Sequence, residues 1–221
     1  MEMRRRMPDD IRADVSSQLF WDSSLDSADI NVEVEEDKVV LTGSVPSYAD
    51  RWEAEVDAFS IPGVKAVDNR IEVRPMISPA PSDRDLATRV ANVLDWNPII
   101  DATGISVSVT GGVVTLSGRV DSFWQKKRAR RIAANVSGVV DVVDDLRVVP
   151  LEEIPDEDIR NDILSALERS YIDASDVEVF VDGCVVILKG TVYGYTDYRA
   201  AESIAAFTNG VCDVRNQLTI A

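Results

Sequence analysis

The residues best suited to do chemistry by type and spacing are five cations next to an aromatic ring. The set consists of Lys126, Lys127, Arg128, Arg130 and Arg131, with Trp124 just before them. Clustered cations attract anions, and each contributes about 1 kcal/mol beside an anionic membrane. The cluster predicts a binding face for anionic phospholipid or a protein partner. The alternative is that these cations pair with acidic neighbours inside the molecule.

The rest of the chain is strongly acidic, so this basic cluster differs in charge from its surroundings. The chain has 221 residues, 23 Lys and Arg against 39 Asp and Glu, and a formal net charge of −16. Residues 1–80 hold 17 acidic and 9 basic residues (net −8), residues 81–153 hold 10 and 9 (net −1), and residues 154–221 hold 12 and 5 (net −7). An acidic chain does not bind nucleic acid by bulk electrostatics. We therefore expect no nucleic-acid partner.

The other reactive residue types argue against catalysis. The chain contains no histidine, which removes Ser-His-Asp triads, HExxH helices and most zinc or iron sites. A nucleophile would need Lys or a carboxylate as its base, and no such spacing stands out. We predict no enzyme, no cofactor and no metal site.

Two cysteines, Cys184 and Cys212, lie in the last third of the chain and form no CxxC pair. Both share strand parity with apolar residues, such as Val186 and Val214, and so point toward the core. Buried free thiols are the default expectation. A disulfide is possible only if the two strands are adjacent, and the sequence leaves this open.

The elements that carry these residues come from an internal repeat. Three segments share an L-x-G-x-V pattern, and its glycines are 118 − 43 = 75 and 190 − 118 = 72 residues apart. A Gly-Val pair follows each of them twenty positions later. The repeated glycines are Gly43, Gly118 and Gly190 in the first pattern, and Gly63, Gly138 and Gly210 in the second. We interpret them as positions of special backbone geometry and close packing, not as phosphate-binding loops.

Each repeat predicts the order helix, strand, strand, helix, strand. The first helix carries an apolar stripe, as in Leu86, Val90 and Leu94, and the first strand alternates apolar and polar residues. The strand-helix-strand part requires a right-handed crossover and therefore a mixed sheet. The expected fold is α+β: three tandem units, at 8–75, 82–149 and 155–221, each with two helices packed on a three-stranded mixed sheet.

The combination of these patterns resembles the BON domain. The matching features are the L-x-G-x-V strand, the helix with spaced alanines, the Gly-Val turn and a final strand such as Val67-Asp68-Asn69-Arg70-Ile71. At Asn69, Asp144 and Asn216 we favour a local side-chain to backbone bond over a ligand contact. BON domains occur in osmotically induced periplasmic proteins. The resemblance implies phospholipid binding or attachment to membranes and partner proteins, a link to stress, and no catalytic residues.

The predicted function is a non-enzymatic binding module that attaches to an anionic membrane surface or an envelope partner. The alternative is a protein–protein scaffold without lipid affinity. No stretch approaches the roughly 20 apolar residues that span a bilayer, and the basic run at the N-terminus lacks a following apolar segment. We expect a cytoplasmic or peripheral membrane protein, with a periplasmic location as the alternative. The oligomeric state is left open.

Overall fold

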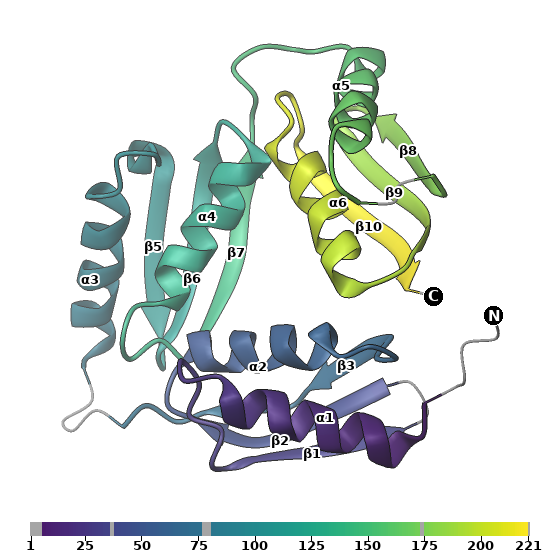
Figure 1. Ribbon diagram of the computed structural model, residues 1–221. Coiled ribbons are helices and arrows are strands. Elements are labelled where there is room, and N and C mark those ends of the chain that lie inside the picture. Colours follow the sequence, from purple (N-terminus) through teal and green to yellow (C-terminus); the bar gives the residue numbers. More distant parts are fainter. Residues whose placement is uncertain (1–5, 36–37, 77–80, 173–174, 221) are drawn as a thin grey trace. The chain divides into compact units, whose positions relative to one another are not determined.

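The computed structural model describes residues 6–35, 38–76, 81–172 and 175–220. They form three modules with the same element order, α-β-β-α-β (Figure 1). The chain divides into two compact units, Met1–Pro81 with Ser137–Asp141 and Ser82–Val136 with Val142–Ala221. The second unit contains most of the second module and all of the third. The predicted α+β architecture of three tandem α-β-β-α-β units is confirmed.

The first module consists of α1 (Pro8–Trp21), β1 (Ile30–Glu35), β2 (Lys38–Val45), α2 (Tyr48–Ser60), β3 (Ala66–Asn69) and β4 (Glu72–Val73). β1 pairs antiparallel with β2, whereas β3 and β4 pair parallel with it. The sheet is therefore mixed, as the crossover through α2 requires.

The other two modules repeat this plan. The second consists of α3 (Asp83–Asp95), a 3₁₀ turn η1 (Ala102–Gly104), β5 (Ile105–Thr110), β6 (Val113–Val120), α4 (Phe123–Ala134) and β7 (Asp141–Val148). The third consists of α5 (Asp156–Glu168), β8 (Val177–Asp182), β9 (Val185–Val192), α6 (Tyr195–Phe207) and β10 (Asp213–Ile220). The central strands are β6 and β9, each between an antiparallel and a crossover neighbour.

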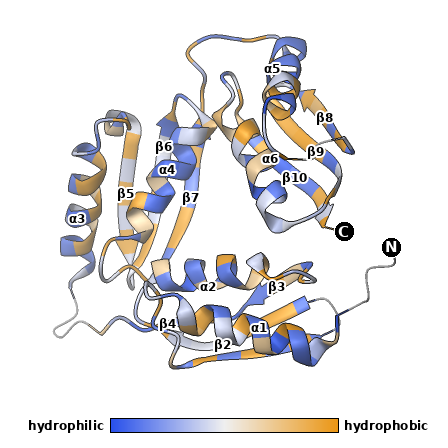
Figure 2. Ribbon diagram, in the orientation of Figure 1, coloured by the Kyte–Doolittle hydropathy of each residue, from blue (hydrophilic) through white to orange (hydrophobic). Residues whose placement is uncertain are grey.

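The core of each module lies between the two helices and the sheet. The apolar stripe of each first helix is buried, as with Leu86, Val90 and Leu94 of α3. Each second helix contributes alanines, such as Ala129 and Ala133 of α4, whose small side chains allow close packing on the strands. Apolar and paler polar residues alternate along β5 (Figure 2), so one face of that strand meets the helices. Among the described residues, no helix has the length and apolarity to cross a membrane.

The first repeated glycine holds the same unusual conformation in every module. Gly43, Gly118 and Gly190 have φ of +117°, +114° and +118°, a region that L side chains rarely adopt. A Cβ on Gly118 would collide with the carbonyl oxygen of Gly104, and the same collision recurs at the other two positions. The central strand therefore passes a backbone carbonyl at a distance that only glycine permits.

The expectation of free thiols in the third module is wrong. Cys184 and Cys212 form a disulfide with a Cα–Cα distance of 5.3 Å. Cys184 lies in the turn between β8 and β9, and Cys212 directly precedes β10, which pairs in parallel with β9. The Cys212 N–H also donates to the Cys184 carbonyl, at 2.9 Å. The adjacency that a disulfide requires is thus present.

Candidate functional site

Helix α4 carries the predicted basic face, and its local sequence sets which way each cation points. Ser122 caps the helix by accepting a hydrogen bond from the Gln125 N–H at 3.2 Å. Ala129 and Ala133 face the sheet and are completely buried. The cations must therefore leave the helix along its flanks and outer side.

The start of α4 and its outer side contact the third module. The Lys127 ammonium pairs with the Glu202 carboxylate of α6, and Trp124 packs on Phe207 with 5.6 Å between ring centroids. Phe123 is buried within the core of the third module, and its N–H donates to the Val211 carbonyl at 3.3 Å. Lys127 and Trp124 of the predicted binding face thus contact the third module.

Lys126 and Arg130 lie on the flank of α4 that faces β7. The Lys126 ammonium donates to the Leu146 carbonyl at 2.8 Å. Asp144 lies between these groups, and its burial raises the pKa of its carboxyl above the ordinary value. The Leu146 N–H and the positive charges of Lys126 and Arg130 oppose that rise without cancelling it. These two cations therefore compensate a half-buried acid.

Arg128 and Arg131 complete the predicted set. Arg128 is half-buried, and its Nε is buried without a hydrogen-bond partner among the described residues. Arg131 is exposed, in the last turn of α4. Of the five cations, Arg131 is the one whose position best suits contact with an external anion.

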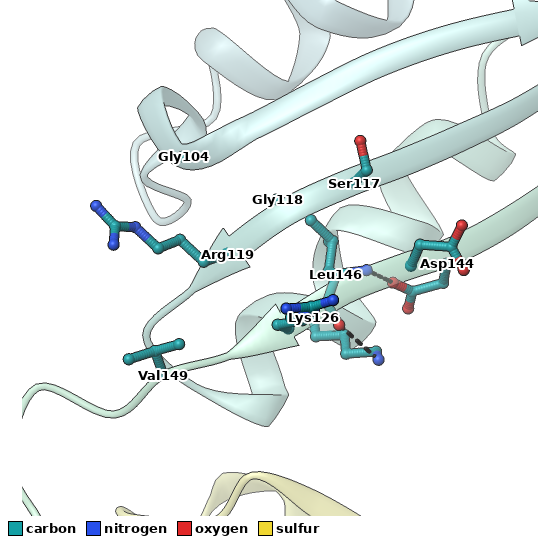
Figure 3. Close-up of a pocket in the computed structure, with 10 residues that line it drawn as sticks. Gly104, Ser117, Gly118, Arg119, Lys126, Asp144, Leu146 and Val149 are labelled. Carbon is teal, nitrogen blue, oxygen red and sulfur yellow. Dashed lines mark hydrogen bonds between the residues drawn. The ribbon is translucent and has the colours of Figure 1, made fainter.

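An open pocket of about 880 Å³ lies beside this flank. The dashed lines in Figure 3 mark the bonds from Lys126 to the Leu146 carbonyl and from the Leu146 N–H to Asp144. Arg119 lines the pocket with its side chain directed outward, and the lining also includes Arg147 and Asp145. Three cations and two carboxylates line the pocket, so its mixed charge does not favour a simple anion.

The preferred interpretation of Asn69, Asp144 and Asn216 is confirmed. Each Oδ1 accepts the N–H two residues later, at 3.2, 3.1 and 3.2 Å respectively. The two asparagines also donate from Nδ2 to a carbonyl of their second helix, Arg51 at 2.7 Å and Tyr198 at 3.3 Å. A carboxylate cannot make that second bond. In the second module the helix residue equivalent to Arg51 and Tyr198 is Lys126. Its ammonium donates to the Leu146 carbonyl of β7, so here the helix side chain makes the link to the last strand.

Sequence reasoning missed a set of exposed aromatic side chains at the ends of the first helices of the first two modules and just beyond that of the third. Trp21 and Trp96 are each 78% exposed, and Tyr171 is fully exposed. Trp21 and Trp96 lie two residues after Leu19 and Leu94, the last buried positions of the apolar stripes. An aromatic residue just beyond a stripe cannot join the core, and this signal could have identified them. We call Trp21, Trp96 and Tyr171 the aromatic tips.

Comparison with known proteins places this architecture in one family. A family model described as BON domain matches residues 9–75, 82–150 and 155–221. Osmotically-inducible protein Y of Escherichia coli is 33% identical over 141 residues, 62% of this chain and 70% of that protein. The outer membrane lipoprotein DolP of Haemophilus influenzae is 33% identical over 108 residues, 48% of this chain and 55% of that protein.

Among solved structures, the C-terminal domain of CdsD, a structural protein of the type III secretion system of Chlamydia trachomatis, is similar. The identity is 16%, the match covers 96% of this chain and 98% of that chain, and the TM-score is 0.27. A TM-score this low does not establish a common arrangement of the whole chain.

Proposed function

The chain belongs to the BON domain family, and we propose that it is a non-catalytic attachment protein that binds a phospholipid surface through its aromatic tips. The observation that carries the proposal is an exposed tryptophan at the end of the first helix in the first two modules, together with an exposed tyrosine three residues after the first helix of the third. Tryptophan and tyrosine favour the boundary between water and lipid, because one end of the ring system is apolar and the other is polar.

Insertion of aromatic rings suits this chain better than electrostatic attachment through α4. Lys127 and Trp124 are engaged by the third module, and the net charge of −16 repels an anionic surface. The second module is the least acidic, at net −1 for residues 81–153, and also carries the half-exposed Ile99 near Trp96. Trp96 is therefore the tip with the weakest electrostatic opposition.

Vesicle co-sedimentation tests this proposal, with neutral vesicles and vesicles containing anionic phospholipid. We expect Trp96→Ala to weaken binding roughly tenfold, because burying a large side chain contributes about 1.5 to 3 kcal/mol and about 1.4 kcal/mol is a factor of ten. The matched control is Leu151→Ala, which removes an exposed apolar residue outside the tips. Binding of the wild type should persist at high salt, since burial of apolar surface is not screened.

A wild-type chain that ignores both kinds of vesicle would overturn the lipid proposal. The rival function, a protein–protein scaffold, would then account for the molecule better. It draws support from the joint between the second and third modules, where Phe123 enters the third core. A joined pair of modules can present one surface to a partner.

For the location, the disulfide supports the periplasmic alternative over the cytoplasm. Structural disulfides persist in oxidising compartments and are rare where thiols are kept reduced. We propose that the chain works in an oxidising compartment. Alkylation of free thiols in cells that produce the chain naturally, followed by mass spectrometry without reductant, should find Cys184 and Cys212 unmodified and linked. Full alkylation of both residues would refute this location.

A further inference from the structure

A buried carboxyl in the first module has no counterpart in the other two. Asp57 lies on α2 and is only 7% exposed. The positions 75 and 147 residues later, which the repeat makes equivalent, are Ile132 and Ile204. An acid thus replaces an apolar residue in the contact between the two helices. Burying an ionised carboxylate costs far more than burying an isoleucine.

The hydrogen bonds of Asp57 account for only one of its oxygens. Oδ1 accepts from the Gln18 amide of α1 at 3.1 Å. Oδ2 is buried and has no hydrogen-bond partner among the described residues. The neighbouring acids are Asp22, at the end of α1, and Glu53 on α2, and no cation of the described residues is among the groups that act on Asp57. An ionised Asp57 would therefore face two like charges with one oxygen unpaired.

Asp22 is arranged in the opposite way. Its Oδ1 accepts from the Ser24 N–H at 2.8 Å and from the Ser24 hydroxyl at 2.7 Å. These bonds stabilise the carboxylate and lower the pKa of Asp22 below its ordinary value. Burial is the main cause that raises the pKa of Asp57, and the negative charges of Asp22 and Glu53 add to the rise. Gln18, which bonds Asp57, and Asp22 are four residues apart at the end of α1, so both lie on the side of that helix that meets Asp57. Two neighbouring carboxyls with opposite shifts divide into one acid and one base.

We infer that Asp57 and Asp22 form a proton-binding site in the seam between α1 and α2, with Asp57 as the donor and Asp22 as the acceptor. A proton supplies the donor that Oδ2 lacks and removes the repulsion between the two acids. Among the described residues, no group of three acidic or cysteine side chains is placed to hold a metal ion, so a shared proton is the simplest partner. Uptake of this proton tightens the first module.

The sign of the effect follows from the raised pKa of Asp57. The folded chain binds the proton at a higher pH than the unfolded chain does. The contribution of Asp57 to stability is therefore fully present below the ordinary aspartate value of 3.8 and is lost as the pH rises through the pKa of folded Asp57. Mild acid stabilises α1 against α2, and neutral pH loosens them.

Carbon-detected NMR of the aspartate carboxyls tests the site in the wild-type chain. We expect Asp57 to titrate above the ordinary aspartate value of 3.8, and Asp22 below it. Asp22→Asn should lower the titration midpoint of Asp57, because it removes the like charge. A wild-type Asp57 that titrates at or below the ordinary aspartate value of 3.8, or one that Asp22→Asn leaves unmoved, would overturn the inference.

The second test measures stability against pH in two ways. Thermal unfolding reports on the whole chain, and hydrogen exchange of peptides from α1 and α2 reports on the first module. Asp57→Asn places an N–H beside Asp22 at every pH and preserves the side-chain shape. We expect the wild-type first module to gain protection as the pH falls, and Asp57→Asn to be more protected at neutral pH with that gain abolished. Asp10→Asn is the control and should keep the gain. A pH response that survives Asp57→Asn would assign the effect to other groups.

Discussion

The second and third modules have the same backbone fold, but different side-chain cross-links stabilise it. At the tip of the first hairpin, Gly112 and Cys184 both have positive φ, +80° and +68°. A helix aspartate accepts two N–H groups of each tip, Asp83 in the second module and Asp156 in the third. Only the third module adds a disulfide. The repeated pattern thus sets the fold, whereas the cross-links belong to single modules.

The strongest test of the common framework is a branched side chain at its central glycine. Gly118→Val and Gly190→Val should each destabilise their module by about 3 to 5 kcal/mol, from backbone strain at positive φ together with overpacking against a carbonyl. Urea denaturation measures the loss. Gly111→Ala is the control, because a Cβ there meets nothing within 4 Å, and should cost only about 1 kcal/mol. Similar losses at Gly111 and Gly118 would contradict the role of the carbonyl.

Sequence alone predicted the part of the molecule that local patterns determine. The spacing of Gly43, Gly118 and Gly190 and the apolar stripes sufficed for the element order and the mixed sheet. Special backbone geometry at these glycines was predicted, but the carbonyl that each approaches was not, because it belongs to the backbone just before the first strand. That approach depends on hairpin register, as in the pairing of Ile105 with Gly118.

The next largest effect should come from removing the cross-link that distinguishes the third module. Cys184→Gly combined with Cys212→Val installs the residues that the second module has at these positions, Gly112 and Val140. We expect a loss of about 3 kcal/mol, since the bond joins residues 28 apart and restricts the unfolded chain. Reductant should lower the melting temperature of the wild type and leave the double variant unchanged. An equal effect of reductant on both would contradict this assignment.

The disulfide is an example of a contact that the sequence alone could not predict, because its two residues are brought together only by the fold. Side-chain parity placed Cys184 and Cys212 toward the core, but their pairing depends on β10 lying next to β9 after a helical crossover. The pairing of Lys127 with Glu202 has the same origin, because it joins residues 75 apart in different modules. Composition revealed the basic cluster but not its partner. Asp57 escaped notice because a single acid in an amphipathic helix is ordinary without its buried surroundings.

The role of Asp144 on β7 can be tested by giving the second module the asparagine that the other two modules have at this position. Asp144→Asn restores the amide that Asn69 and Asn216 use to reach their helices, and should stabilise the module by about 1 kcal/mol at neutral pH. Because burial raises the pKa of Asp144, wild-type stability at this site is present in acid and is lost as the pH rises through that pKa. Thermal melts should show this dependence in the wild type and not in the variant. Asn216→Asp is the reciprocal control and should introduce such a dependence into the third module.

The smallest expected losses of stability come from reversing charges on α4, and they test whether α4 joins the second and third modules. Lys127→Glu places a like charge against Glu202 and should cost at most about 1 kcal/mol, because both side chains are partly exposed to solvent. Adding Glu202→Lys should recover the loss if the pair joins the modules. Arg131→Glu is the matched variant on the exposed last turn; loss of a cation at the helix C-terminus should cost about 0.5 kcal/mol, and Glu202→Lys should not recover it.

Vesicle binding of the same variants separates the two interpretations of this helix. If α4 is a binding face, both charge reversals weaken attachment to anionic vesicles, and the weakening disappears at high salt because the Debye length falls to about 3 Å at 1 M. If α4 is an inter-module contact, Lys127→Glu lowers stability and neither variant changes attachment. The pairing of Lys127 with Glu202 and the packing of Trp124 on Phe207 favour the second outcome. If Arg131→Glu instead loses attachment and is destabilised no more than expected, α4 is the site that binds anionic lipid. The aromatic tips would then contribute less to attachment than α4 does.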